Sequence, residues 1–120
     1  MCGIVGYIGQ RDCTDVLMQG LEKLEYRGYD SAGIAVFEKT GIKTVKTKGK
    51  LADMRHKLDI EGSPVGHCGI GHTRWATHGE PSTVNAHPQY TREKRVVLVH
   101  NGIIENYQEI KESLLKKGYT

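Results

Sequence analysis

Short apolar runs of strand length alternate with helical patterns along this chain, and this alternation limits the fold more than any other feature of the sequence. Residues 4–8 and 32–37 are β-prone runs bounded by turn residues. Between them, apolar side chains recur at helical spacing after Asp12, which stands where a helix cap is expected. The pattern predicts a strand, a helix that ends before Gly28, and a second strand.

The alternation continues to the end of the chain. Residues 39–41 predict a turn into an exposed strand over residues 42–48, which forms an antiparallel hairpin with the strand before it. Residues 96–99 read as a strand of the buried type. Two further helices are expected from apolar spacing, and Gly118 closes the second. Their apolar residues are Leu51, Met54 and Leu58, then Tyr107, Ile110 and Leu114. A layered α+β fold follows.

Two glycines interrupt the β-like run over residues 66–73. Gly69 and Gly71 alternate with larger side chains, and glycine weakens a strand. Their repetition on one face therefore predicts close approach of another backbone or of a ligand. Residues 73–88 show no apolar periodicity and predict a loop, long enough that a functional role is expected.

Composition bounds the class of protein. With 120 residues, 38% hydrophobic and 26% charged, the chain reads as one globular domain. No apolar run approaches the roughly 20 residues of a membrane span, and the first ten residues lack signal-peptide features. Three cysteines without a CxxC pair favour a cytoplasmic, reducing location. The net charge of +3 is spread among mixed-sign clusters, so nucleic acid is not an expected partner.

A cysteine occupies position 2, directly after the initiator methionine. Removal of Met1 would give Cys2 both a thiol nucleophile and a free α-amino group, which can act as general base without a histidine. With Met1 attached, that nitrogen is an amide and has no such role. The alternative is that Cys2 is a small apolar residue without chemistry.

Two polar clusters supply candidate binding and catalytic groups. Arg74 is shaped to grip a carboxylate, and Trp75, Thr77 and His78 follow it, although Arg74 could equally stack on Trp75 at the surface. The second cluster is the pair Asn101 and Gly102. The amide of Asn101 and the N–H of Gly102 could form an oxyanion hole, or the pair could be a turn.

Six histidines raise the question of a metal site. None shows the spacing of a known zinc motif, and strand alternation places His67 on the face opposite Cys68 and His72. The sequence therefore predicts no metal and no cofactor.

Five segments together resemble the glutaminase domain of the class II glutamine amidotransferases. They are CGIVG (2–6), LEYRGYDSAG (24–33), GIGHTRWATHG (69–79), NAHP (85–88) and HNGIIEN (100–106). The motifs YRGYD (26–30) and TRWAT (73–77) are most similar to those of the members that aminate fructose-6-phosphate. They differ from the corresponding segments of the purine-pathway amidotransferase, glutamate synthase and asparagine synthetase.

The resemblance implies an N-terminal-nucleophile hydrolase fold, four-layered αββα with two antiparallel sheets. It implies that Cys2 attacks the side-chain amide of L-glutamine, forms a glutamyl thioester and releases ammonia. By the same resemblance, Asn101 and Gly102 form the oxyanion hole, while Arg74, Trp75, Thr77 and His78 bind the substrate.

The resemblance also implies what residues 1–120 lack. The domain is expected to be incomplete at its C-terminal end, without an aspartate that binds the glutamine α-amino group and without the sugar-isomerase domain. A homodimer is expected for the full-length enzyme. Gln89 follows Pro88, where the family usually has histidine. The alternative function is a non-catalytic glutamine-binding or interaction fragment of the same fold.

Overall fold

Four antiparallel strands form the central sheet of the protein. The computed structural model describes residues 3–24, 30–74, 86–102 and 104–119. The strands lie in the order β1 (Gly3–Ile8), β4 (Cys68–Arg74), β2 (Ser31–Glu38) and β3 (Gly41–Lys48). Each of these four strands was predicted from the sequence, and β2 and β3 form the predicted hairpin.

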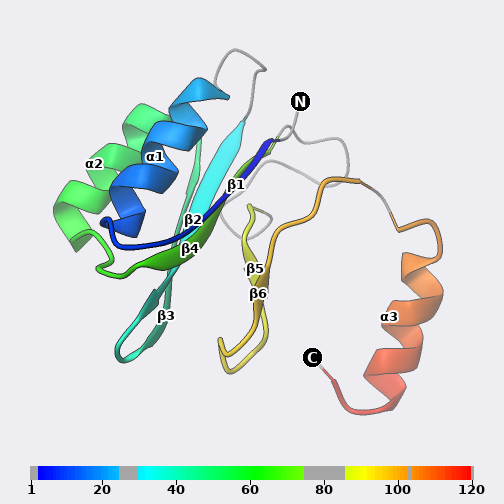
Figure 1. Ribbon diagram of the computed structural model, residues 1–120. Coiled ribbons are helices and arrows are strands. Elements are labelled where there is room, and N and C mark those ends of the chain that lie inside the picture. Colours follow the sequence, from blue (N-terminus) through cyan, green and yellow to red (C-terminus); the bar gives the residue numbers. More distant parts are fainter. Residues whose placement is uncertain (1–2, 25–29, 75–85, 103, 120) are drawn as a thin grey trace.

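Two helices cover one face of this sheet. Helices α1 (Cys13–Lys23) and α2 (Leu51–Glu61) lie side by side on it (Figure 1). Asp12 is the N-cap residue of α1, as predicted, but its side chain makes no capping hydrogen bond. The core lies between helices and sheet, where apolar residues of both are buried. They include Leu17, Leu21, Ile34, Val36, Val45, Leu51, Met54 and Leu58.

The glycines of β4 make room for α1. A Cβ at Gly69 would lie 2.6 Å from the backbone oxygen of Ala35 and 2.6 Å from Sγ of Cys13. A Cβ at Gly71 would lie 2.9 Å from Val5 and 3.5 Å from Leu21. A close approach is therefore present, but apart from the Ala35 oxygen of the neighbouring strand, the approaching atoms are side chains of α1 and of the neighbouring strands and not the predicted backbone or ligand.

Strand β3 is less exposed than the sequence predicts. Val45, Lys46 and Thr47 are buried. Helix α2 packs on one side, where Nζ of Lys57 donates a hydrogen bond of 2.6 Å to the Lys46 carbonyl. On the other side, Nζ of Lys46 lies 4.8 Å from the centre of the Tyr90 ring. Both faces of the strand are therefore covered, although its composition is polar.

A small second sheet lies on the other face of the central sheet. It pairs β5 (Gln89–Tyr90) with β6 (Val97–Leu98), and helix α3 (Tyr107–Lys116) stands beyond it (Figure 1). The expected order of helices, sheet, sheet and helix is present. The predicted strand over residues 96–99 is present as β6, but the prediction that it is buried is wrong, because Val96 is 59% and Leu98 52% exposed. Strand β6 pairs only with the two-residue β5, and no described helix shields these side chains.

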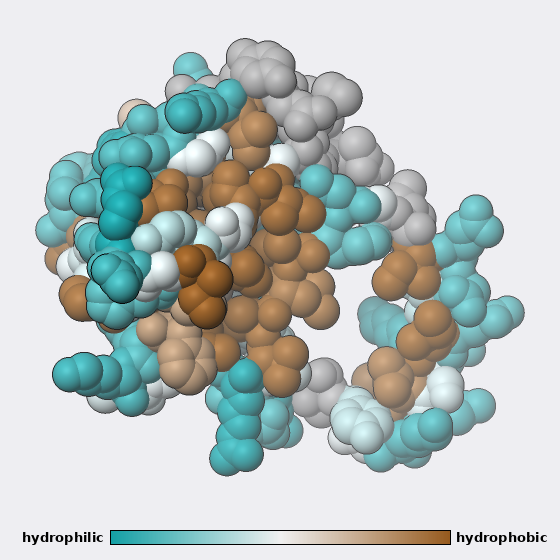
Figure 2. Space-filling view, in the orientation of Figure 1, coloured by the Kyte–Doolittle hydropathy of each residue, from teal (hydrophilic) through white to brown (hydrophobic). Residues whose placement is uncertain are grey.

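Helix α3 forms as predicted but buries none of its residues. Gly118 closes it with a φ of 91°, and the N–H groups of Gly118 and Tyr119 donate to the carbonyls of Leu115 and Leu114. Its apolar side chains lie on the side toward the main body, which also presents apolar surface (Figure 2). No helix of the described residues is long and apolar enough to cross a membrane.

Candidate active site

One end of the central sheet brings Arg74, a predicted site residue, together with other polar residues. Gly3, at the start of β1, pairs with Thr73, and Ser31, at the start of β2, pairs with Arg74 at the end of β4. The hydroxyl oxygens of Ser31 and Thr73 are buried and have no hydrogen-bond partner among the described residues. Buried polar groups of this kind are rare in ordinary cores and are frequent at functional sites. This end of the sheet is therefore the candidate site.

A hydrogen bond joins this end of the sheet to the Asn101 segment. Nε2 of His72 lies 2.6 Å from Oδ1 of Asn101. His72 is only 1% exposed, whereas Asn101 is an exposed residue. The bond therefore ties a surface amide to a side chain fixed in the interior.

His87 packs on the ring of His72. The two ring centres are 4.5 Å apart, with an angle of 30° between the planes. Burial lowers the pKa of His72, and the hydrogen bond to Asn101 opposes this effect in part. The pKa of His87 falls to about 4, mainly through burial and also through the charges of His72 and Arg74. Both imidazoles are therefore neutral at pH 7.

The His87 segment reaches His72 because residue 33 is glycine. Gly33 pairs with His72 across the sheet, and a Cβ on Gly33 would overlap the carbonyl oxygen of His87. It would also lie 2.9 Å from the carbonyl carbon of His87 and 3.0 Å from Cδ of Pro88. Glycine here permits the backbone of a distant segment to lie directly on the sheet.

Arg74 is half-buried at the end of β4. Its carbonyl accepts a hydrogen bond of 2.8 Å from the N–H of Asp30, which continues the pairing with β2. Its positive charge is close enough to lower the pKa of both His72 and His87. The structure thus places a cation beside the histidine pair.

The backbone after Asn101 requires glycine. Gly102 has a φ of 137°, a conformation that residues with a side chain rarely adopt. Asn101 and Gly102 follow β6 without entering a strand or helix. This conformation suits a turn and also leaves the N–H of Gly102 unused by regular structure.

The other two thiols are poor candidates for the chemistry. Cys13 is buried, and burial, with the nearby Cys68 and Asp12, raises the pKa of its thiol to about 11. Cys13 is therefore a packing residue. Cys68 is exposed, but it pairs with Ile8, five residues along β4 from Thr73 and away from the candidate site.

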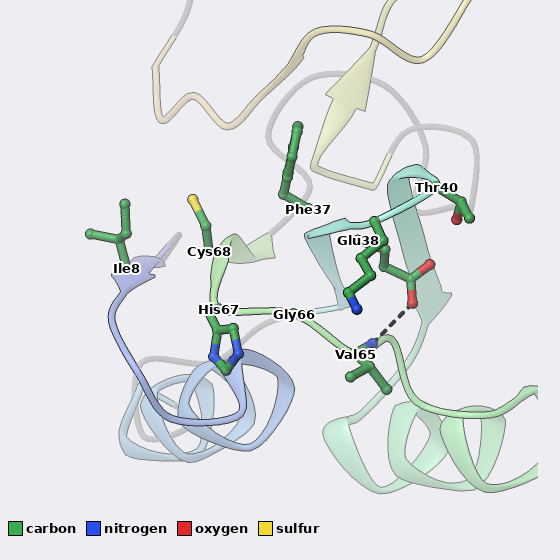
Figure 3. Close-up of a pocket in the computed structure, with 9 residues that line it drawn as sticks. Ile8, Phe37, Glu38, Thr40, Val65, Gly66, His67 and Cys68 are labelled. Atoms are coloured by element: carbon green, nitrogen blue, oxygen red, sulfur yellow. Dashed lines mark hydrogen bonds between the residues drawn. The ribbon is translucent and has the colours of Figure 1, made fainter.

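A wide apolar hollow of about 700 Å³ lies at the opposite end of the sheet (Figure 3). Ile8, Phe37 and Cys68 line it, and the N–H of Val65 donates a hydrogen bond of 2.9 Å to Glu38 at its edge. Ile8 pairs with Cys68, five residues along β4 from the Thr73 end. The hollow holds none of the predicted site residues and is distinct from the candidate site.

Several predicted site residues are not placed by the structure. Cys2, Trp75, Thr77 and His78 lie outside the described residues. Among the described residues, no group of three or more histidine, cysteine, aspartate or glutamate side chains is arranged to hold a metal.

Comparison with known proteins gives relatives that match nearly the whole chain. The glutamine–fructose-6-phosphate aminotransferase (isomerizing) of Clostridium perfringens is 59% identical over 119 residues, which is 99% of this chain. The protein of the same name from Bacillus subtilis is 59% identical over 116 residues. The chain spans 19% of the length of each of these relatives. No protein-family model matches the chain.

Solved structures share the fold. The allosteric regulatory enzyme of purine biosynthesis superposes with a TM-score of 0.83 at 25% identity, over all of this chain and 26% of that chain. Glutamine phosphoribosylpyrophosphate amidotransferase from B. subtilis gives 0.81 at 24% identity, over the same shares. The resemblance to the class II glutamine amidotransferases is confirmed. The predicted α+β fold of the class II amidotransferases, with N-terminal-nucleophile hydrolase architecture, is confirmed with it.

The contribution of His72 and His87 to this site was not predicted from the sequence, where His72 stood out only as a metal candidate on the same face as Cys68. The signal that could have indicated His72 is the sequence GHTR (71–74), which places a histidine two positions before Arg74, on the same face of one strand. The contact with Asn101, 29 residues later, has no local signal in the sequence.

Proposed function

We propose that this chain is the glutamine-hydrolysing part of an enzyme that supplies ammonia for the amination of fructose-6-phosphate to glucosamine-6-phosphate. One observation carries the proposal. Arg74 and the His72–Asn101 pair converge at the end of the sheet where β1 begins, and Gly3 of that strand directly follows Cys2 in sequence. The identity with the aminotransferases over nearly the whole chain supports it.

The proposed chemistry is acyl transfer through Cys2. After removal of Met1, the α-amino group takes the thiol proton, and the sulfur attacks the side-chain carbonyl carbon of L-glutamine. The C–N bond then breaks, the same proton passes to the leaving nitrogen, and ammonia departs. A glutamyl thioester remains. Water then attacks the thioester to give glutamate and restore the thiol.

The other residues stabilise negative charges on the substrate and on the reaction intermediate. The side-chain amide of Asn101 and the N–H of Gly102 stabilise the oxyanion of the tetrahedral intermediate. The guanidinium of Arg74 holds the α-carboxylate of glutamine, because its planar fork matches a carboxylate. Thr77 and His78 complete the substrate contacts, and Trp75 covers the bound glutamine. No metal or cofactor enters this scheme.

The wider setting is part of the same proposal. The full-length protein would be a cytoplasmic homodimer whose sugar-isomerase domain lies outside residues 1–120. The odd number of cysteines and the absence of a CxxC pair support the reducing compartment.

The test is a glutaminase assay on the intact protein. We expect glutamine to be converted to glutamate and ammonia, mass spectrometry to show that Met1 is absent, and Cys2→Ala to remove the activity and the labelling by an electrophilic glutamine analogue. Cys13→Ala is the matched control and should keep both. Labelling at Cys13 or Cys68, or a folded wild-type protein that only binds glutamine, would refute the proposal.

A further inference from the structure

A buried histidine, His72, bonds the side chain of Asn101, which the proposed function assigns to stabilising the oxyanion. Nε2 of His72 lies 2.6 Å from Oδ1 of Asn101, well within hydrogen-bond distance. His72 is a core residue of β4, and Asn101 belongs to an exposed segment without regular structure. Without this bond, the amide of Asn101 would rotate about its own side-chain torsions.

The protonation of His72 fixes the direction of this bond. The ring is buried and neutral at pH 7, so only one of its nitrogens carries a proton. An amide oxygen can only accept, and the proton is therefore on Nε2. Because Oδ1 of Asn101 is turned toward His72, the two hydrogens of Nδ2 point away from it. Within the described part of the chain, Nδ2 makes no hydrogen bond.

Packing fixes the plane of the His72 ring. His87 lies against it with ring centres 4.5 Å apart, and Gly33 lets the His87 backbone lie directly on the neighbouring strand. Three contacts therefore follow one another, from Gly33 to His87, from His87 to His72 and from His72 to Asn101. Each contact restricts the position of the next side chain.

We propose that His72 is a positioning residue, which donates from Nε2 to Oδ1 of Asn101 and so aims Nδ2–H at the developing oxyanion. This inference rests on the proposed function, because it needs Asn101 as the donor. In this proposal His72 acts only through Asn101. Its effect is to remove the cost of orienting Asn101 during the reaction.

The first test compares two substitutions in the intact protein. His72→Phe keeps a ring against His87 but has no N–H, and His72→Gln keeps a donor at the end of its side chain. We expect His72→Phe to lower kcat for glutamine hydrolysis about 10- to 100-fold, the range typical of a misplaced catalytic group, with little change in KM. His72→Gln should recover most of the loss. His56→Phe, on the exposed side of α2, is the control and should retain the wild-type kcat.

A double substitution separates positioning from a general structural effect. Asn101→Ala removes the group that His72 orients, so adding His72→Phe to it should lower kcat no further. The rate at which iodoacetamide alkylates Cys2 should be unchanged in His72→Phe, since no oxyanion forms in that reaction. A multiplicative loss in the double variant, a wild-type kcat in His72→Phe, or an effect on KM alone would overturn the inference.

A measurement on the unsubstituted protein remains decisive if a variant fails to fold. Nitrogen chemical shifts of labelled histidine should show His72 as the neutral Nε2–H tautomer at pH 7. The Nδ1–H tautomer or a protonated ring would overturn the inference. Absence of Cys2-dependent hydrolysis in the wild-type protein would instead refute the proposed function, so the two failures are distinguishable.

Discussion

Gly33→Ala tests whether the His87 segment rests on the sheet. Alanine is preferred over glycine by about 0.5 to 1 kcal/mol in a strand interior, so propensity alone predicts a more stable protein. The structure predicts the reverse. The new methyl group would overlap the carbonyl oxygen of His87 and lie 2.9 Å from its carbonyl carbon. These are backbone atoms, which cannot rotate away as the end of a side chain can.

The size of the effect follows from the space required. Carbon atoms pack best near 3.5 to 4.0 Å, so the His87 carbonyl has to retreat by about 1 Å. Overpacking of this kind costs about 1 to 3 kcal/mol. Subtracting the gain in propensity from the middle of this range, about 2 kcal/mol, leaves a net loss of about 1 to 1.5 kcal/mol, which corresponds to roughly 5- to 13-fold more frequent opening.

Hydrogen–deuterium exchange of the intact protein measures this opening locally. Peptides that contain residues 31–36 and 86–90 should exchange faster in Gly33→Ala by the factor above. Gly6→Ala is the matched control, because a Cβ there meets its nearest atom at 4.0 Å in the same sheet. Equal exchange in the two variants would show that the His87 segment does not lie against Gly33.

Three further outcomes follow from the same site. Arg74→Lys should raise KM for glutamine while leaving the reactivity of the Cys2 thiol unchanged, because only the bidentate grip is lost; an unchanged KM would contradict the clamp. The Asn101→Asp protein should fold, since the carboxylate can still accept the hydrogen bond from His72. It should hydrolyse glutamine at least ~100-fold more slowly, and a near-normal kcat would show that Asn101 is only a turn residue. His87 has a pKa of about 4 in the folded protein and 6.5 ordinarily, so below pH 6.5 the unfolded chain binds a proton that the folded chain does not. The free energy of unfolding should therefore fall as the pH is lowered from 6.5 to 4, and His87→Gln should flatten this dependence in pH-resolved thermal unfolding; an equal slope in both proteins would refute the assignment.

Local patterns determined most of the secondary structure. The strands of the central sheet and the three helices of the described residues were predicted from the sequence, because apolar spacing and turn residues act over a few neighbours. The glycines of β4 were also predicted to mark a close approach, and α1 lies there. The family resemblance, carried by five short segments, was likewise available from the sequence alone.

Burial was decided by tertiary packing and was predicted less well. The polar strand β3 is covered on both faces, whereas the apolar strand β6 is exposed. Composition describes what a strand could bury, but the neighbouring elements decide what it does bury. The exposed Cys68 and the exposed apolar side of α3 show the same difference.

The arrangement of the site was also decided by the tertiary structure. The sequence determined the types of side chain available: a cysteine at position 2, an arginine after a glycine-rich strand, and an asparagine followed by glycine. It gave no indication that His72 would bond Asn101 or that Gly33 would carry the His87 backbone. These contacts join residues 29 and 54 positions apart, and only the folded sheet brings such distant positions within hydrogen-bond or van der Waals distance.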